Sequence, residues 1–226
     1  MDTNIENLVM ISSLIKTSSE PLTYSNIRSV YTHDERFEQT LKTIESVRKY
    51  IPNAQILLID CSDFSDSQET VLKNACDMFL NVYNINNMRS ILCNGPSKSL
   101  AEATQTHLVI EYLTKNKISC KNFFKISGRY ALNQNFNFSF YDNDKNIGRI
   151  QPCMSTYFLT SFYKLNSETL PKLNNMILNN LKALQNGIPY EEFFRVFMSS
   201  CDNVEYLQVA IGIDEYISVN GEHRCH

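Results

Sequence analysis

Short apolar runs along the chain predict the buried strands of a sheet. Four runs are rich in Leu, Ile, Val and Phe and are bounded by polar or turn-forming residues: 8–11, 56–59, 78–83 and 123–126. Each is short and apolar at consecutive positions, which is typical of a strand that is covered on both faces. A further region, 147–164, also has the composition of extended structure.

Between these runs, apolar residues recur at the three-to-four-residue spacing of amphipathic helices. Thr32 or Asp34 can cap the first helix, Ser97 can cap the third, and Gly187 marks a break between the last two. The predicted helices cover 34–51, 67–76, a long segment from Ser97 through Leu113, 167–186 and 189–201. The segment 16–32 predicts a loop, 133–146 a loop or an edge excursion of the sheet, and 209–219 irregular or extended structure.

Buried strands that alternate with amphipathic helices are typical of an α/β domain. We therefore expect residues 1–226 to form one domain, with a mostly parallel central sheet and helices on both faces. No repeat, low-complexity linker or shift in composition marks a domain boundary. A sheet of this kind binds its ligands beyond the carboxyl ends of its strands.

Composition narrows the classes of function. The chain is 43% hydrophobic and 20% charged with a net charge of −3, so it has no global positive field to attract nucleic acid. Its seven cysteines are widely spaced and form no C-x-x-C pair, which favours reduced thiols. The amino terminus is acidic and the apolar run near it is too short to span a bilayer. We expect a cytoplasmic protein without a transmembrane span.

Polar side chains follow three of the predicted strands. Ser12 and Ser13 follow the first, Asp60 the second, and Ser127 and Arg129 the fourth. Because the carboxyl ends of parallel strands meet at one edge, we expect these side chains to surround a common ligand site. Two alternatives stay open, since Asp60 could instead cap a turn and Arg129 could pair with an interior carboxylate.

Two lysines could add positive charge to this site. Lys98 lies at a predicted helix start, where free backbone N–H groups suit an anionic ligand, although a solvated lysine beside a helix cap is the alternative. Lys125, Ser127 and Arg129 alternate along a strand, which places them on one side. Cations there could neutralise a diphosphate leaving group without a metal ion.

Two pairs of carboxylates are candidates for a general base. Glu191 and Glu192 lie in the first turn of the last predicted helix, where the helix dipole favours them for structural reasons alone. A carboxylate at a helix start that faces a cleft could also deprotonate an acceptor hydroxyl. Asp214 and Glu215 form the second pair, and we select Glu191, Glu192 and Asp214 as the catalytic candidates.

Two clusters could hold a metal ion. Asp142 and Asp144 form a D-x-D pattern that can chelate Mn²⁺ or Mg²⁺, but the same residues are also typical of a polar hairpin tip. The carboxyl-terminal tail holds His223, Cys225 and His226, which could be metal ligands or a solvated terminus. The sequence therefore predicts no certain metal ion, with Asp142 and Asp144 as the weaker alternative.

Four segments of the chain resemble the small nucleotide-diphospho-sugar glycosyltransferases of the GT-A type: 36–48, 51–60, 95–102 and 124–130. The likeness is closest to enzymes of surface-polysaccharide gene clusters and of large DNA viruses, and it covers roughly the first two thirds of the chain. It implies a transferase of glycan biosynthesis that moves a sugar from a UDP- or GDP-linked donor to a glycan or glycoconjugate hydroxyl, in a host cytoplasm if the protein is viral. It also implies that Glu191 or Glu192 faces the acceptor and that the donor pocket is lined by Ser12, Ser13, Arg36, Asp60 and Lys98.

The chain departs from this family at one position. The strand after the long helix normally ends in a D-x-D that holds a metal ion against the donor diphosphate, and here that place is taken by Ser127-Gly128-Arg129. Arg129 and Lys125 are candidates to replace the ion. Two other functions stay open. One is a sugar nucleotidyltransferase, which would normally have a glycine-rich first loop that is absent here, and the other is a non-catalytic sugar- or partner-binding domain.

Overall fold

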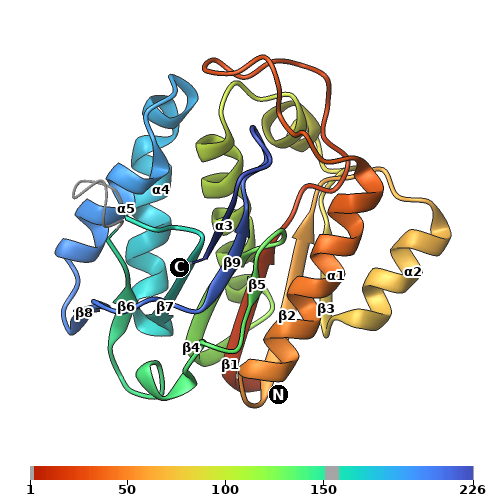
Figure 1. Ribbon diagram of the computed structural model, residues 1–226. Coiled ribbons are helices and arrows are strands. Elements are labelled where there is room, and N and C mark those ends of the chain that lie inside the picture. The colour runs from red at the N-terminus through yellow and green to blue at the C-terminus, as the bar shows by residue number, and fades with distance from the viewer. Residues whose placement is uncertain (1–2, 151–157, 226) are drawn as a thin grey trace.

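The computed structural model describes residues 3–150 and 158–225. A seven-stranded sheet forms its centre, in the order β3-β2-β1-β4-β7-β6-β8 (Figure 1). The strands are β1 (Thr3–Ser12), β2 (Ala54–Asp60), β3 (Met78–Asn81), β4 (Ile118–Ser127), β6 (Asn146–Gly148), β7 (Phe162–Asn166) and β8 (Val204–Tyr206). The first four strands run parallel, β6 and β8 pair in parallel, and β7 is antiparallel to both β4 and β6. The mostly parallel α/β sheet expected from the sequence is confirmed.

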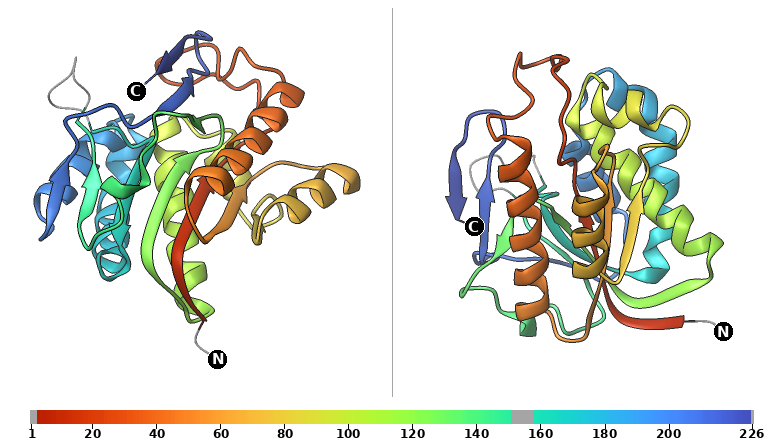
Figure 2. Two further views of the ribbon diagram at one scale, coloured as in Figure 1. Left: turned by 60° about the horizontal axis from the view of Figure 1, so that its bottom comes forward. Right: turned by 90° about the vertical axis from the view of Figure 1, so that its right-hand side faces the viewer.

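Helices cover both faces of the sheet, as Figure 2 shows. Successive residues of a strand point to opposite faces, so Leu8 and Met10 of β1 pack in one core and Val9 and Ile11 in another. The first core includes side chains of α3, α4 and α5, and the second includes side chains of α1 and α2. The helices are α1 (His33–Tyr50), α2 (Asp66–Ala75), α3 (Lys98–Lys115), α4 (Leu170–Gln185) and α5 (Tyr190–Ser199).

Side-chain caps fix where the helices begin. Thr32, one of the two residues expected to cap α1, accepts from the backbone N–H of Glu35, whose side chain accepts from Thr32 in return. Ser97 caps α3 by accepting from the Leu100 N–H at 3.0 Å. Gly187 separates α4 from α5 with a φ of +90°, a conformation that favours glycine.

The structure also contains elements that the sequence did not predict. A second sheet has the order β10-β9-β5; β9 lies in the segment expected to be irregular or extended, and β5 and β10 lie in segments with no predicted element. These strands have two to four residues, too few to show an apolar pattern. Within 147–164, expected to be extended, β6 and β7 begin and end the segment, and residues 151–157 lie outside the described part. The unpredicted elements are β5 (Ala131–Leu132), β8, β10 (His223–Cys225) and the short helices η1 (Arg89–Cys93) and η2 (Phe138–Phe140). β9 spans Ile213–Tyr216, and the short helix η3 (Ser167–Thr169) begins the helix predicted over 167–186.

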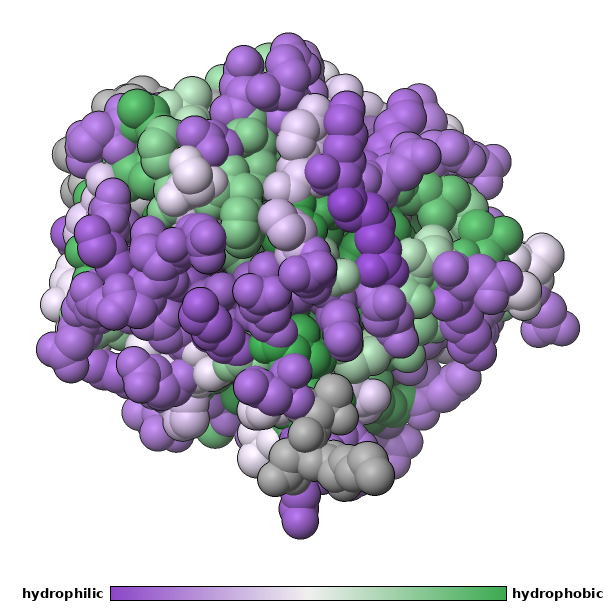
Figure 3. All heavy atoms as spheres, turned by 90° about the horizontal axis from the view of Figure 1, so that it is seen from below, coloured by the Kyte–Doolittle hydropathy of each residue, from purple (hydrophilic) through white to green (hydrophobic). Residues whose placement is uncertain are grey.

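Because strands β1, β2 and β4 are parallel, their amino ends lie on one side of the molecule and their carboxyl ends on the other. β1, β2 and β4 run upward in Figure 1, so their carboxyl ends meet at the top. Hydrophilic side chains cover most of the opposite side of the molecule, with smaller hydrophobic areas between them (Figure 3).

Among the described residues, no helix has the length and apolar character needed to cross a membrane.

Candidate active site

A cleft of about 360 Å³ opens at the carboxyl ends of β1 and β4. Two connecting segments lie over this edge, the loop between β1 and α1 and the turn between β9 and β10, and they join where Val30 N–H donates to Ser218 O at 2.7 Å. The structure brings together seven of the residues that the sequence predicted for a site. These are Ser12, Ser13, Arg36, Lys98, Ser127, Arg129 and Glu191.

Close packing of two strand ends forms the floor of the cleft. Gly128, just after β4, donates its N–H to Ser12 O at 2.8 Å, and its own carbonyl accepts from Thr40 Oγ1 at 3.0 Å. A Cβ atom at Gly128 would lie 3.0 Å from the Ser13 Cβ, so a larger residue would push the strand ends apart. Glycine at this position therefore lets the residues after β4 meet those after β1.

Four of the cationic side chains that line the cleft form no ion pair with a carboxylate in the described part of the chain. They are Arg28, Arg36, Lys98 and Arg129, and none of them takes part in the ion pairs found among residues 3–150 and 158–225. Arg28 and Arg36 are 6% and 4% exposed and donate to backbone carbonyl oxygens. Lys98 donates to Ser218 Oγ. Buried cations that lack a counterion are the arrangement that an anionic ligand completes.

The cations repel one another across the cleft. Burial, and after it the nearby charges of Arg129, Arg36 and Arg28, together lower the pKa of Lys98 to about 7. Burial, followed by Arg129, lowers the pKa of Arg36 to about 9. An anion placed between these groups would favour their charged forms, which strengthens the case for a phosphate-binding site.

Three glutamates also line the cleft: Glu102, Glu191 and Glu215. Burial raises the pKa of Glu191 to about 7, and Glu102 contributes to this shift. Glu192, the alternative to Glu191, is exposed to solvent and is not among the cleft-lining residues. The first turn of α5 therefore presents one of its two carboxylates to the cleft, with a pKa suited to a general base near neutral pH.

Lys125 and Asp60 support the cleft from below and are not among its lining residues. Lys125 is fully buried, and its ammonium donates to Glu102 Oε1, to Ser127 Oγ at 3.1 Å and to Thr160 O at 2.8 Å. Its three donors are thus used inside the protein. Asp60 is also fully buried, its pKa is raised by burial, and its Oδ2 accepts from the Ile15 N–H at 3.0 Å.

Asp214 and Glu215 lie on opposite faces of β9. Asp214 accepts from Asn133 Nδ2 at 2.9 Å and is not among the cleft-lining residues. Glu215 lines the cleft and accepts from Ser161 Oγ at 2.5 Å. Successive residues of a strand point to opposite faces, which explains why Glu215 lines the cleft and Asp214 does not. The sequence alone did not show that this segment is a strand.

The D-x-D pair Asp142 and Asp144 lies near the beginning of β4, at the opposite end of the strand from the cleft. Asp144 O accepts from Asn166 Nδ2, and Asn166 is paired with Asn122, near the beginning of β4, whereas the cleft lies at its end. Both carboxylates belong to exposed residues that are not among those lining the cleft.

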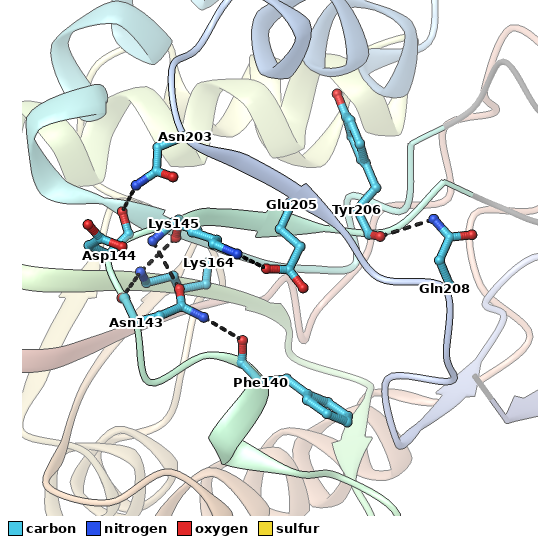
Figure 4. A network of polar contacts seen from close by, with 9 residues as sticks. All are labelled: Phe140, Asn143, Asp144, Lys145, Lys164, Asn203, Glu205, Tyr206 and Gln208. Atoms are coloured by element: carbon cyan, nitrogen blue, oxygen red, sulfur yellow. Dashed lines mark hydrogen bonds and ion pairs between the residues drawn. The ribbon is translucent and has the colours of Figure 1, made fainter.

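This turn is built around an internal lysine, as Figure 4 shows. Lys164 is fully buried and donates to Asn143 O and Lys145 O, both at 2.7 Å, and to Asn166 Oδ1 at 2.9 Å. Burial lowers the pKa of Lys164 to about 8. These carbonyl oxygens of the turn therefore already accept hydrogen bonds from a cation of the protein itself, the Lys164 ammonium.

The end of β4 does not fit a hard divalent cation. Ser127, Gly128 and Arg129 offer a hydroxyl and a guanidinium there, whereas Mg²⁺ and Mn²⁺ prefer carboxylate oxygens. One group of three potential metal ligands occurs in the described part of the chain, and its members do not line the cleft: Asp214, His223 and Cys225. His226, which the sequence grouped with the last two, lies outside the described residues.

Sequence reasoning missed several residues of the cleft. Arg28 lies in the loop before α1, where no periodicity singles it out. Glu102 was detectable, because it follows Lys98 by four positions and therefore shares its face of α3. Gln105, on the same helix, donates from Nε2 to Ser13 O at 2.5 Å and ties α3 to the end of β1.

No protein-family model and no curated protein matches the chain. Solved structures do. The apo form of the glycosyltransferase GlyE from Streptococcus pneumoniae TIGR4 has a TM-score of 0.54 at 8% identity, covering 90% of this chain and 45% of GlyE. This chain thus spans less than half the length of GlyE.

Two further structures are similar over most of both chains. A glycosyltransferase involved in glycosylation of the PBCV-1 major capsid has a TM-score of 0.52 at 12% identity, covering 89% of this chain and 81% of its own. The Mn/GDP form of core-mannan synthase A from Aspergillus fumigatus has a TM-score of 0.54 at 8% identity, with coverage of 92% and 73%. At these identities the likeness shows the fold. The chain has the GT-A fold of glycosyltransferase structures.

Proposed function

We propose that the protein is a glycosyltransferase that moves a sugar from a UDP- or GDP-linked donor to a hydroxyl of a glycan or glycoconjugate. The observation that carries this proposal is the group of four cations in the cleft, Arg28, Arg36, Lys98 and Arg129, which lacks carboxylate partners among the described residues. The GT-A fold supports it, and one of the similar structures is a Mn/GDP form.

In this proposal the cations hold the donor diphosphate. Lys98 lies at the start of α3, where backbone N–H groups and the helix dipole also favour negative charge. Arg129 follows β4 at the position where the family normally has its metal-binding motif. When the bond between the anomeric carbon and the diphosphate oxygen breaks, charge develops on that oxygen. Fixed cations beside it stabilise the leaving group.

Glu191 is the proposed general base. The acceptor hydroxyl oxygen forms the new bond to the anomeric carbon, and the hydroxyl proton passes to the Glu191 carboxylate. A pKa of about 7 allows this group to take a proton during the reaction and to release it afterwards. Glu192 and Asp214 are weaker candidates, because neither is among the residues that line the cleft.

Nucleotide binding tests the proposal directly. UDP or GDP at about a hundred times its Kd should raise the melting temperature of the protein by about 5–10 °C. Arg129→Ala should remove most of this rise. Arg195→Ala is a matched control, because Arg195 is exposed on α5 and is not a cleft residue.

Two results would count against the proposal. One is the absence of a shift with either nucleotide at millimolar concentration, and the other is an equal loss of the shift in both arginine variants. Release of pyrophosphate from a nucleoside triphosphate, without sugar transfer, would identify a nucleotidyltransferase instead. Tight sugar binding without turnover of any donor would identify a binding domain.

We also propose a cytoplasmic location. The cysteines of the described part of the chain are all free thiols. Reduced thiols are typical of proteins in a reducing compartment, which supports the proposal. Fractionation of the producing cells would test it, and recovery of the protein outside the cytoplasm would contradict it.

A further inference from the structure

The β9–β10 hairpin brings three potential metal ligands together on one face. In the antiparallel register Asp214 is opposite Cys225, and His223 is opposite Tyr216. Directly opposite residues share a face, and residues two apart on a strand do so as well. Asp214, His223 and Cys225 therefore lie on the same face, while Glu215 and Arg224, which form the alternate pair, line the cleft on the other.

The three ligand atoms form a compact triangle. Cys225 Sγ lies 3.4 Å from Asp214 Oδ1 and 3.9 Å from His223 Nε2, and the remaining side, from His223 Nε2 to Asp214 Oδ1, is 3.8 Å. In a tetrahedral zinc site, with bonds of about 2.3 Å to sulfur and about 2.0–2.1 Å to nitrogen and oxygen, ligand atoms are about 3.3–3.6 Å apart. To hold an ion, the two sides that end on His223 Nε2 must therefore shorten by about half an ångström or less, and the side between Cys225 Sγ and Asp214 Oδ1 must lengthen slightly.

Neighbouring residues hold the ligands in position. Asn133 Nδ2 donates to Asp214 Oδ1 at 2.9 Å, which orients the carboxylate from outside, as is typical of metal sites. The imidazole of His223 stacks on the ring of Tyr216, with ring centroids 4.9 Å apart and planes 25° apart. Two of the three ligands are thus oriented by contacts that do not require the ion.

We propose that Asp214, His223 and Cys225 bind one zinc-type transition-metal ion, with water as the fourth ligand. Imidazole and thiolate are ligands that Zn²⁺ takes and that Mg²⁺ and Ca²⁺ do not favour. The thiol proton leaves to solvent when the ion binds. The ion would connect β9 to β10 and so stabilise the hairpin whose other face carries Glu215 and Arg224 at the cleft.

Cobalt provides a direct test, because Zn²⁺ itself has no d–d absorption. The full chain, freed of metal with a chelator and then desalted, is titrated with Co²⁺ and followed by absorption. We expect a sulfur-to-cobalt charge-transfer band in the near ultraviolet that saturates at one ion per chain and disappears when Zn²⁺ is added. Zn²⁺, but not Mg²⁺, should also slow hydrogen exchange in residues 213–225.

Variants separate this site from adventitious binding. Cys225→Ser should abolish the charge-transfer band, and Cys201→Ser, which changes a half-buried thiol just after α5, should leave it intact. Asn133→Ala should weaken Co²⁺ binding about tenfold by releasing the Asp214 carboxylate. The inference is overturned if no band forms, if the band persists in Cys225→Ser, or if Cys201→Ser loses it equally. The circular dichroism of each metal-free variant confirms that it has folded.

Discussion

At the scale of single residues, the fully and partly buried lysines of this protein serve two different purposes. Lys125 and Lys164 are both fully buried, and each ammonium donates to three acceptors inside the protein. The Lys98 ammonium has Ser218 Oγ as its one hydrogen-bond acceptor in the described part of the chain. A lysine with all three donors used holds structure together, whereas one with spare donors in a cleft is available to a ligand. This distinction favours Lys98 over Lys125 as a contact of the donor.

The acid limb of the pH profile should report Glu191. A general base must be ionised, and the pKa of Glu191 is raised to about 7, so kcat at saturating donor and acceptor should rise with pH and reach half of its maximum near pH 7. Glu191→Gln should lower kcat by about 10²–10⁴-fold and remove this limb. Steady-state kinetics between pH 5 and 8.5 provides the measurement.

Glu192→Gln provides the comparison for that measurement, because its carboxylate differs from Glu191 by one position and is exposed. If Glu192→Gln loses the acid limb and Glu191→Gln keeps it, the assignment of the base within this pair is reversed. If both variants keep the limb, the base is neither residue.

At the scale of elements, those that the sequence predicted have strong local signals. Each of the strands β1, β2 and β4 has a continuous apolar run, and α1 has both an apolar period and a capping residue. β5 and β10 have no such signal, since their few residues form a sheet only through pairing with β9. Short strands that depend on distant partners cannot be read from a local pattern.

The capping box of α1 links an element to the site. Thr32→Ala removes the side chain that accepts from the Glu35 N–H and should cost about 1 kcal/mol of the free energy of unfolding. For a chain of this size that corresponds to a fall in melting temperature of about 2–4 °C. Because Arg36 lies in the first turn of α1 and reaches the cleft, nucleotide affinity should fall as well.

Thr32→Ser keeps a hydroxyl at the cap and should restore both the melting temperature and the affinity. Thermal unfolding and nucleotide titration of the two variants decide the point. An unchanged melting temperature in Thr32→Ala would show that the box contributes nothing measurable. A lower melting temperature with unchanged affinity would show that the position of Arg36 does not depend on it.

At the scale of the whole molecule, the cleft is assembled from segments that are distant in sequence. Arg28 comes from the loop after β1, Arg36 from α1, Lys98 from α3 and Arg129 from the end of β4. The sequence could predict that strand ends converge, and it selected three of these four cations. It could not show which side chains turn inward, so Asp60 and Lys125 were chosen although they lie beneath the cleft, and Arg28 was missed. Side-chain direction depends on packing between elements, which one sequence does not specify.

The combined field of these cations predicts how nucleotide binding depends on pH. In the free protein the pKa of Lys98 is about 7, lowered by burial and by the charges of Arg129, Arg36 and Arg28. A bound diphosphate favours the ammonium form, so above pH 7 binding must include proton uptake and the affinity falls as the pH rises. UDP affinity should therefore weaken about fivefold between pH 7 and 8, a range in which its phosphates are already ionised. Isothermal titration in buffers of different ionisation enthalpy measures both the affinity and the protons taken up.

Lys98→Met should bind UDP more weakly at pH 7 and lose this pH dependence, because the group that takes up the proton is gone. Lys182→Met, which changes an exposed lysine of α4 outside the cleft, should retain both the affinity and its decline. A decline of equal size in Lys98→Met would place the titrating group elsewhere. An affinity that does not change from pH 7 to 8 in the unaltered protein would mean that Lys98 is not in contact with the diphosphate, and the anion would then be held by the three arginines alone.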